Sequence, residues 1–586
     1  MNPLLASMFW VCLGLIFLTT VFQGIGLSVQ RAFGLRVTMI KDLLTGPWVG
    51  FAATLALLQA WHLLLPVNGG ALLLISALGV LGVVSNAGDV MSLATIQART
   101  IRRLIPLLFV STIFLAYQTT RPPGMYDSFL YHIPSIKWAS SYPVVPGLGL
   151  LHDRLGFNQS YFLYAAMLNN GPFTEKYHHI ASALLLFWSL ATSLYAILNL
   201  LSPKANPSPW AAFSAMSCVP VIAKSVDAAY CSSPTPDTCV FLLGIVIASE
   251  LISLLLGRSP ETEQDNGCFG AANGNPDKIA YSVFCICFLG VIGITVKLNF
   301  AVYGGVAAGV ATVAAGRLKV FGSISRWKIR FSCILFVSVL LLWMGRGVVL
   351  TGYPLFPLQY GAFPVEWKLT PRMLDETRDA IVGWARMPGD HFRDSLHNFT
   401  WIKPWAIEVL RDRSNVVMPL SLAFCGVVIV AMKRGFATMA PFAWLVLLAP
   451  VAAIVFCLVT APDPRFAGSA FWVLGIGTLA VAFSVVNSET TLYVVIVGST
   501  IILTSLLNPG DIVHRRLNDT GPLTARETKV MTTESGVKVV VPLDGNQVGN
   551  ASLPNAPSFN PKLRLRVSGR LGSGFVLSGE QVQPVP

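Results

Sequence analysis

Six charged or histidine side chains fall within one segment, residues 126–158, which lies between two strongly apolar stretches: Asp127, His132, Lys137, His152, Asp153 and Arg154. A connector between two membrane helices needs only a few small polar residues, but this segment is long, aromatic and rich in proline. Binding and catalytic residues concentrate on loops that a rigid scaffold holds in place. The segment therefore predicts a site at a membrane surface, and Tyr126 is a further candidate because it flanks the first acid.

Asp127 follows the fourth apolar stretch closely, so we expect it near the membrane surface. A carboxylate in that position can act as a general base or hold a metal ion. The alternative is a helix N-cap, because the residues that follow it, SFLYH, can start a surface helix. A lone histidine in an aromatic cluster is better explained by a structural role, which is our interpretation of His132.

Three basic residues are candidates for binding a phosphate group at headgroup depth: Lys297, Arg346 and Arg465. Lys297 lies in a long apolar region, where a lysine costs about 2.5–3.5 kcal/mol and needs a partner or a wet cavity. The alternatives are snorkelling of Lys297 to the interface and interfacial anchoring by the two arginines. A local pair between Asp463 and Arg465 contributes little if it is exposed.

Two more candidates lie at the predicted outer ends of spans. Asp237 belongs to the segment SSPTPD, where capping of a helix N-terminus is the leading alternative. Tyr353 belongs to the segment GYPLFP, which follows Arg346.

The composition places these residues in a membrane protein, since 54% of the chain is hydrophobic and only 12% is charged. Apolar runs near 20 residues are long enough to span a bilayer. We count about fourteen candidate spans, at 5–27, 47–65, 70–86, 103–119, 180–201, 209–226, 237–257, 280–296, 299–315, 330–350, 416–432, 437–459, 468–486 and 491–508. The ten cysteines show neither a disulfide framework nor zinc-ligand spacing.

The net charge of +13 is explained by loop position rather than by nucleic-acid binding, because no basic run with interleaved aromatic residues occurs. If the spans alternate strictly, five basic loops fall on one side of the membrane, which the positive-inside rule assigns to the cytoplasm. Both termini are then outside. The outer face receives the loops 118–179 and 351–415, the turns 225–236 and 460–466, and the C-terminal tail.

Two outer segments have their own predicted structure. Thr370 and Pro371 form a favourable helix start, and the apolar residues that follow at helical spacing predict an amphipathic surface helix. In the tail, residues 537–541 and 562–567 are typical of strands between turns rich in glycine, asparagine and proline. We expect a small β-rich appendage that covers the outer face.

An in-to-out helix followed by a long outer loop that opens with Tyr126-Asp127 resembles the GT-C superfamily of membrane glycosyltransferases. The segments YDSFLYHIPSIKW, YPVVPGLGLLHDRLGFN, SSPTPD, TVKLN, GYPLFP and PDPRF also resemble an uncharacterised bacterial family of multi-pass proteins with this layout. The GT-C resemblance implies that Asp127 is the base or metal ligand. It also implies that the sugar donor is a polyprenyl phosphate or pyrophosphate on the outer face. The chain departs from the superfamily in its three extra N-terminal spans and in lacking an Asp-Asp or Asp-Glu pair in the first loop.

The expected architecture is therefore an all-α polytopic membrane protein with three parts. Residues 1–102 form a three-helix N-terminal extension, residues 103–508 a GT-C-like transmembrane core, and residues 509–586 a periplasmic β-rich tail. We expect it in a bacterial inner membrane.

The leading functional hypothesis is transfer of a sugar from a polyprenyl-linked donor to a glycan, lipid or protein acceptor of the cell envelope. The sequence makes no cofactor certain and leaves a divalent metal ion open. A transporter or flippase of a lipid-linked glycan, with Lys297 lining its path, is one alternative. A non-enzymatic membrane protein of envelope assembly is another. Transporters usually place polar residues near the membrane midplane, whereas the polar groups here gather at one face, which favours the enzyme.

Overall fold

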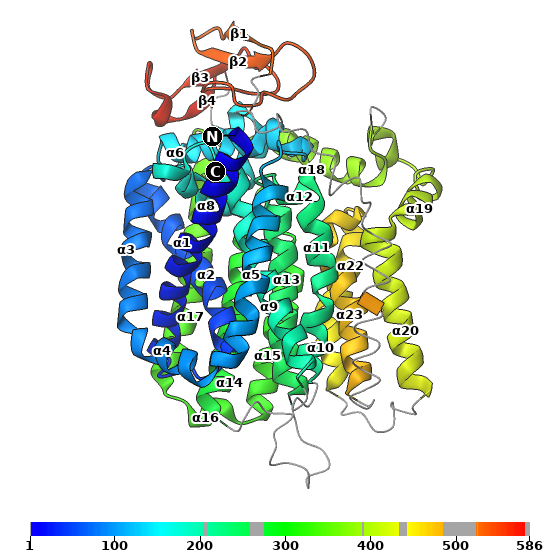
Figure 1. Ribbon diagram of the computed structural model, residues 1–586. Helices are drawn as coiled ribbons and strands as arrows, with labels where there is room; N and C mark the ends of the chain where they lie inside the picture. The colour runs from blue at the N-terminus through cyan, green and yellow to red at the C-terminus, as the bar shows by residue number, and fades with distance from the viewer. Residues whose placement is uncertain are drawn as a thin grey trace.

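The computed structural model describes residues 2–202, 208–257, 275–389, 392–432, 442–484, 498–499, 523 and 526–579. Within these residues, ten helical segments are long and apolar enough to cross a membrane. They are α1 (Pro3–Ala32), α2 (Ile40–Leu64), α5 (Ala98–Thr119), α9 (Tyr177–Leu200), α13 (Pro236–Leu256), α14 (Pro276–Val296), α15 (Phe300–Arg317), α17 (Arg326–Thr351), η6 with α20 (Arg413–Met432), and η7 with α22 (Ala443–Thr460). They lie side by side in one bundle (Figure 1), as expected of a multi-pass membrane protein.

Three of the fourteen predicted spans take another form, and a fourth lies almost entirely outside the described residues. The span at 70–86 is α3 (Gly69–Ser85), which continues after a bend of 57° into α4 (Ala87–Ile96), and this pair counts as an eleventh span if taken together. The span at 468–486 is α23 (Ala470–Phe483), an apolar helix of only 14 residues. The span at 491–508 lies almost entirely outside the described residues.

The span at 209–226 is broken into α10 (Pro209–Met216) and α11 (Cys218–Val226). Pro220 gives a physical reason for the break. A proline has no backbone N–H, and its ring collides with the carbonyl group four residues earlier, here that of Met216. The apolar composition predicted a single span, because hydropathy does not indicate where a helix is interrupted.

The first helices pack into the rest of the bundle. α1 lies against α2 and α3 and also contacts α5 and α9, while α2 contacts α14 and α17. At the crossing of α1 and α3, a side chain on Gly24 would collide with the backbone of Gly79, so only glycine permits this approach. One hydrophobic core extends from Val11 to Phe483.

The loop 118–179 folds into short helical segments at one end of the bundle: η1 (Ser128–His132), α6 (Ile133–Ser141), α7 (Leu148–Leu151), η2 (Asp153–Phe157), α8 (Tyr161–Leu168) and η3 (Gly171–Phe173). The turn between α11 and α13 contains α12 (Ala228–Cys231) and bonds to this loop, since the Gly124 amide donates to the Ala228 carbonyl at 3.3 Å. The remaining short segments are α16 (Val320–Ser323), η5 (Phe392–Leu396), α19 (Ile402–Arg411), η8 (Pro464–Ala467) and η9 (Leu571–Ser573).

The amphipathic surface helix is confirmed as α18 (Pro371–Arg386). The Thr370 hydroxyl accepts a hydrogen bond from the Met373 amide at 3.4 Å, as expected of an N-cap. On the two faces of this helix, Leu374 is fully buried and Trp384 is 48% exposed.

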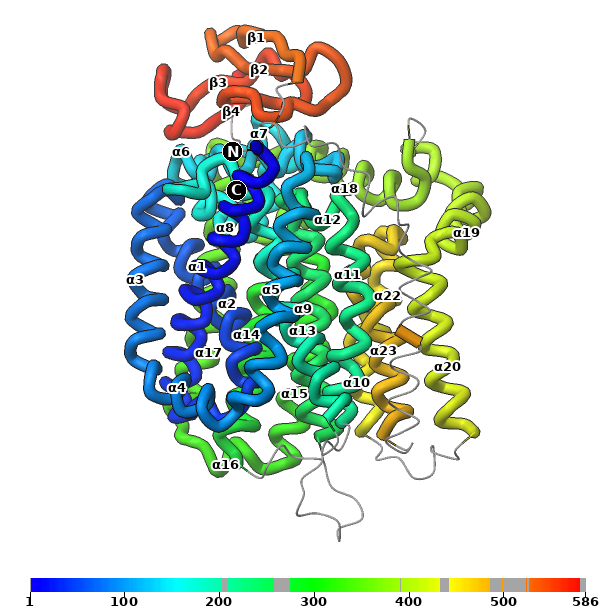
Figure 2. Tube along the Cα trace, viewed as in Figure 1, coloured from blue at the N-terminus to red at the C-terminus, as the bar shows by residue number. Residues whose placement is uncertain are grey.

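The β-rich tail is also confirmed. Strand β1 (Thr528–Thr532) pairs antiparallel with β2 (Lys538–Pro542), and β3 (Leu563–Leu565) pairs antiparallel with β4 (Phe575–Leu577). The tail lies beyond the same end of the bundle as the start of α1, directly over α6 and α7 (Figure 2). A second hydrophobic core joins Trp138 and Val144 of the loop to Leu563 and Phe575 of the tail.

Gly147 is a critical point of this docking. Its φ is +65°, and a Cβ there would collide with the Phe575 carbonyl oxygen. We expect Gly147→Ala to detach the tail and to make residues 526–579 more sensitive to limited proteolysis. Gly569→Ala is the matched control, because Gly569 has a φ of +77° but no atom within 4 Å of its Cβ position. Equal protease resistance of Gly147→Ala and the wild-type protein would contradict this role.

Candidate functional site

Charged residues from four separate parts of the chain meet below the tail, at the end of the bundle where the loop 118–179 lies. We call this group the charge cluster; its members are Asp127, Arg154, Asp237, Lys297, Asp463 and Arg465. It contains three carboxylates and three cations. All six were site candidates from the sequence.

Two spanning helices position the first ion pair. Asp237 lies in the first turn of α13, where its backbone N–H donates to the Thr235 hydroxyl at 3.3 Å. Lys297 follows the last residue of α14 in an extended conformation, and α15 begins at Phe300, so the side chain lies at a helical hairpin. The Lys297 ammonium group donates to Asp237 Oδ1. Lys297 therefore has a partner, as an intramembrane lysine requires.

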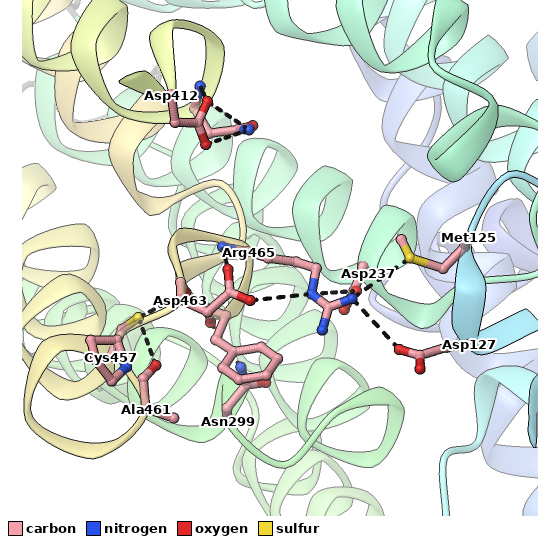
Figure 3. Close-up of polar contacts among 12 residues, drawn as sticks. Met125, Asp127, Asp237, Asn299, Asp412, Cys457, Ala461, Asp463 and Arg465 are labelled. Atoms are coloured by element: carbon pink, nitrogen blue, oxygen red, sulfur yellow. Dashed lines mark hydrogen bonds and ion pairs between the residues drawn. The ribbon is translucent and has the colours of Figure 1, made fainter. Parts of the chain in front are cut away.

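Arg465 is the centre of the charge cluster (Figure 3). It lies in η8, where the Asp463 carboxylate caps the turn by accepting from the Arg465 amide at 2.9 Å. Its guanidinium group lies 3.5 Å from Asp127 Oδ2, 3.8 Å from Asp237 Oδ2 and 3.8 Å from Asp463 Oδ2. Burial lowers the pKa of Arg465, but attraction to these three carboxylates outweighs burial and raises the pKa above its ordinary value.

Asp127 faces two guanidinium groups. Its Oδ1 lies 3.5 Å from Arg154 Nη1 and its Oδ2 lies 3.5 Å from Arg465 Nη1. The side chain makes no capping hydrogen bond to η1, so the N-cap interpretation does not describe it. Both contacts are longer than a normal hydrogen bond of about 2.7–3.2 Å. The carboxylate lone pairs therefore stay available to a further donor.

Aromatic rings flank the cations. Lys297 Nζ lies 4.9 Å and Arg465 Cζ lies 5.3 Å from the centre of the Phe466 ring. Arg154 lies 5.8 Å from the centre of the Tyr131 ring. These contacts stabilise the cations by cation–π attraction without neutralising them. Asn299 fixes this geometry because its Nδ2 donates to the Phe466 carbonyl at 2.8 Å.

Two other candidates contact the tail instead of the charge cluster. The exposed Tyr126 donates its hydroxyl to Asn546 Oδ1, and its carbonyl accepts from Gln547 Nε2 at 2.8 Å. Lys137 Nζ donates to the carbonyl groups of Asn550 and Ala551 at 3.1 and 2.7 Å. The segment 546–551 therefore lies directly beside Asp127 and its neighbours.

The remaining candidates are spread around the site. Asp153 connects the loop to α18, because its Oδ2 accepts a hydrogen bond from the Thr377 hydroxyl at 2.9 Å. Its Oδ1 lies 3.3 Å from Nε2 of the neighbouring His152. The Tyr353 hydroxyl donates to the Leu369 carbonyl at 3.2 Å, which is a structural contact. Arg346 does not join the charge cluster but lies buried in a separate cavity.

His132 is buried against Tyr131 and Phe162, as expected of a structural histidine. Burial lowers its pKa to about 4, against the opposing attraction of Asp127 and Asp237. Burial likewise lowers the pKa of His152 to about 4. Both imidazoles are therefore neutral at pH 7.

We expect the protein to lose stability as the pH falls from about 6.5 towards 4. In this window the unfolded chain binds protons at His132 and His152 that the folded chain does not bind, so unfolding becomes more favourable. The measurement is the unfolding temperature at pH 7 and at pH 5. His132→Gln is expected to reduce the difference between the two temperatures. If the unfolding temperatures at pH 7 and pH 5 differed equally in His132→Gln and wild type, His132 would not cause the loss of stability.

Among the described residues, no three histidine, cysteine or acidic side chains gather as a metal site. Sequence analysis missed Tyr131, Phe466 and Asn299, which line or hold the charge cluster. Only the tertiary structure distinguishes these from the many other aromatic and amide side chains.

A protein-family profile described as Domain of unknown function (DUF8201) matches residues 8–472, which is most of the chain and includes the whole charge cluster. The comparison with curated proteins gives no match, and neither does the comparison with solved structures.

Proposed function

This chain belongs to the family described as Domain of unknown function (DUF8201), and from its site we propose that it is a membrane glycosyltransferase of the GT-C type. The protein transfers a sugar from a polyprenyl phosphate or pyrophosphate donor to a glycan, lipid or protein acceptor of the envelope. One observation carries the proposal. An accessible carboxylate, Asp127, lies beside Arg154 and Arg465 at the end of a membrane bundle.

In the proposed reaction, Asp127 accepts the proton of an acceptor hydroxyl group. The hydroxyl oxygen forms a bond to the anomeric carbon of the donor sugar, and the bond from that carbon to the phosphate oxygen breaks. The leaving polyprenyl phosphate keeps the electron pair. Arg465 and Lys297 stabilise the negative charge that develops on it, and both lie in the charge cluster with Asp127.

The residues of the charge cluster do not suit a divalent metal ion. Asp127, Asp237 and Asp463 already lie within 4 Å of at least one cationic side chain each. A metal ion there would experience repulsion from Arg465, which faces all three carboxylates. The proposed reaction therefore uses only side chains of the protein.

We further propose fourteen membrane crossings around a GT-C-like core, with both termini on the periplasmic side of a bacterial inner membrane. The start of α1 and the strands of the tail lie at the same end (Figure 1), which requires an even number of crossings between them. Basic side chains gather at the opposite end, where Lys328 pairs with Asp277 at 2.6 Å and Arg31 donates to the Ser85 carbonyl at 2.8 Å. The positive-inside rule favours a cytoplasmic location for that end.

A flippase or transporter of a lipid-linked glycan is the second candidate, and one observation favours it. Glu250, on the same helix as Asp237 but 13 residues further along, pairs with Lys41 at 3.6 Å beside a cavity. Paired charges inside membrane helices commonly mark a transport path.

The test uses the purified protein in lipid nanodiscs with a panel of radiolabelled polyprenyl-phosphate and polyprenyl-pyrophosphate sugars. We expect one donor to release its sugar to water or to an added acceptor. Binding of a donor without any release of sugar would favour the transporter, and failure to bind any donor of the panel would refute the proposal.

A further inference from the structure

A small cavity lies beside the charge cluster, between α2, α6, η2, α8 and α17. We call it the Arg346 cavity; its polar lining includes His62, Trp138, Arg154, Asn158, Gln159 and Arg346. Its volume is about 40 Å³. Since one water molecule needs about 10–15 Å³ by the same measure, the cavity has room for about three waters or one small polar group.

Arg346 is the most unusual residue of this cavity. Its side chain is 3% exposed, and its Nε and Nη1 atoms are buried without a hydrogen-bond partner. Arg346 also takes part in no ion pair with any residue that the structure describes. The lining contains no aspartate or glutamate. A buried charge without a partner costs several kcal/mol, so the compensating negative charge must come from a bound group.

The other polar atoms of the lining indicate which group fits. Trp138 Nε1 is a buried donor without a partner, and the His62 ring also lines the cavity. The amide oxygens of Asn158 and Gln159 are unpaired acceptors. The Asn158 orientation is set by the bond from its Nδ2 to the Trp343 carbonyl.

The ligand must therefore accept several hydrogen bonds and carry a hydroxyl group of its own. A carboxylate can accept about four hydrogen bonds, but it carries no hydroxyl group that could donate to the amide oxygens of Asn158 and Gln159. A tetrahedral phosphoryl group has enough oxygens, and arginine binds it with charge-assisted hydrogen bonds. Its protonated oxygen, or a neighbouring hydroxyl group, can donate to the amide oxygens.

We propose that the Arg346 cavity is a binding site for a phosphoryl group. The site is separate from the charge cluster, which it touches through Arg154, a residue that both lines the cavity and pairs with Asp127. It does not depend on sugar transfer at Asp127. Free inorganic phosphate and the phosphate of a lipid-linked compound present the same phosphoryl oxygens to this site. Arg346 and His62 lie near the ends of α17 and α2, so both sources are candidates.

The test measures binding of inorganic phosphate and of polyprenyl phosphate to the full-length protein in nanodiscs by calorimetry, at constant ionic strength. We expect wild type to bind at least one of them and Arg346→Gln to bind it at least tenfold more weakly. Binding of inorganic phosphate identifies the free ion as a ligand, and binding of polyprenyl phosphate alone identifies a lipid-linked group. Binding of neither by wild type would overturn the proposal, as would equal affinity in Arg346→Gln.

Arg330→Gln is the matched control, because Arg330 lies exposed on the same helix and its loss changes the net charge equally. It is expected to bind phosphate as wild type does. In phosphate-free buffer, Arg346→Gln is expected to be no less stable than wild type, since the change removes an uncompensated charge; a purely structural arginine predicts the opposite. If Arg346→Gln does not fold, Trp138→Phe removes a single donor, and unchanged phosphate affinity in that variant would overturn the proposal.

Discussion

Replacing Asp127 by asparagine is expected to lower the rate of sugar transfer by a factor on the order of 10² to 10⁴, the usual contribution of a general base. Asparagine has nearly the same shape as aspartate but cannot accept the proton of the acceptor hydroxyl group. The fold is expected to persist, because Arg465 keeps its contacts with Asp237 and Asp463 after the change. The measurement is kcat in nanodiscs with saturating donor, alongside the unfolding temperature.

The control for this change is Asp153→Asn. Asp153 belongs to the same loop and is also an acid, but it contacts Thr377 and His152 rather than the charge cluster. We expect its kcat to stay within a few-fold of wild type. If Asp127→Asn kept wild-type activity, Asp127 would not be the base, and the mechanism proposed here would be wrong.

The second large effect concerns the pair of Asp237 and Lys297. Removing one partner of a buried ion pair leaves an uncompensated charge and typically costs about 3–5 kcal/mol. The side chains of Asp237 and Lys297 are only 10% and 17% exposed, so this case applies. We expect Asp237→Asn and Lys297→Met each to lower the free energy of unfolding by this order of magnitude. In Lys297→Met, Arg465 remains 3.8 Å from the Asp237 carboxylate and places that loss near the lower limit.

The double variant provides the decisive comparison. Each single change leaves the other residue without its partner. The double variant, Asp237→Asn with Lys297→Met, is therefore expected to lose less free energy of unfolding than the two single variants lose in total. Arg372 and Glu376 on α18 form an exposed pair at 2.9 Å that serves as the control cycle, with an expected coupling of at most about 1 kcal/mol. Strict additivity at Asp237 and Lys297 would show that the two residues do not interact.

Hydropathy predicted most of the bundle, because a span of about 20 apolar residues is a strong signal. The errors have local causes. Pro220 interrupts one predicted span, and Asn86 lies at the bend between α3 and α4, where its Nδ2 donates to the Gly82 carbonyl at 2.8 Å. In the tail, strict alternation predicted β3, whereas β4 is a three-residue strand that sequence alone cannot identify.

The candidate site was predictable only in part. The positive-inside rule placed Asp127, Lys297 and Arg465 on one face, and the structure brings them into one charge cluster. Their pairing was not predictable, because it depends on how α13, α14 and η8 meet in space. The role of His62 had no signal at all, since it comes from α2, far from the other residues of the Arg346 cavity in the sequence.

The most direct test of the proposed function follows the fate of the sugar label in sealed proteoliposomes. The labelled polyprenyl-linked donor is supplied in one leaflet, and both the chemical form and the side of the label are determined over time. The glycosyltransferase proposal predicts that label leaves the donor as free or acceptor-linked sugar in wild type and stays on the donor in Asp127→Asn. Label that crosses the membrane still attached to its lipid, at the same rate in both proteins, would contradict the proposal and identify a flippase.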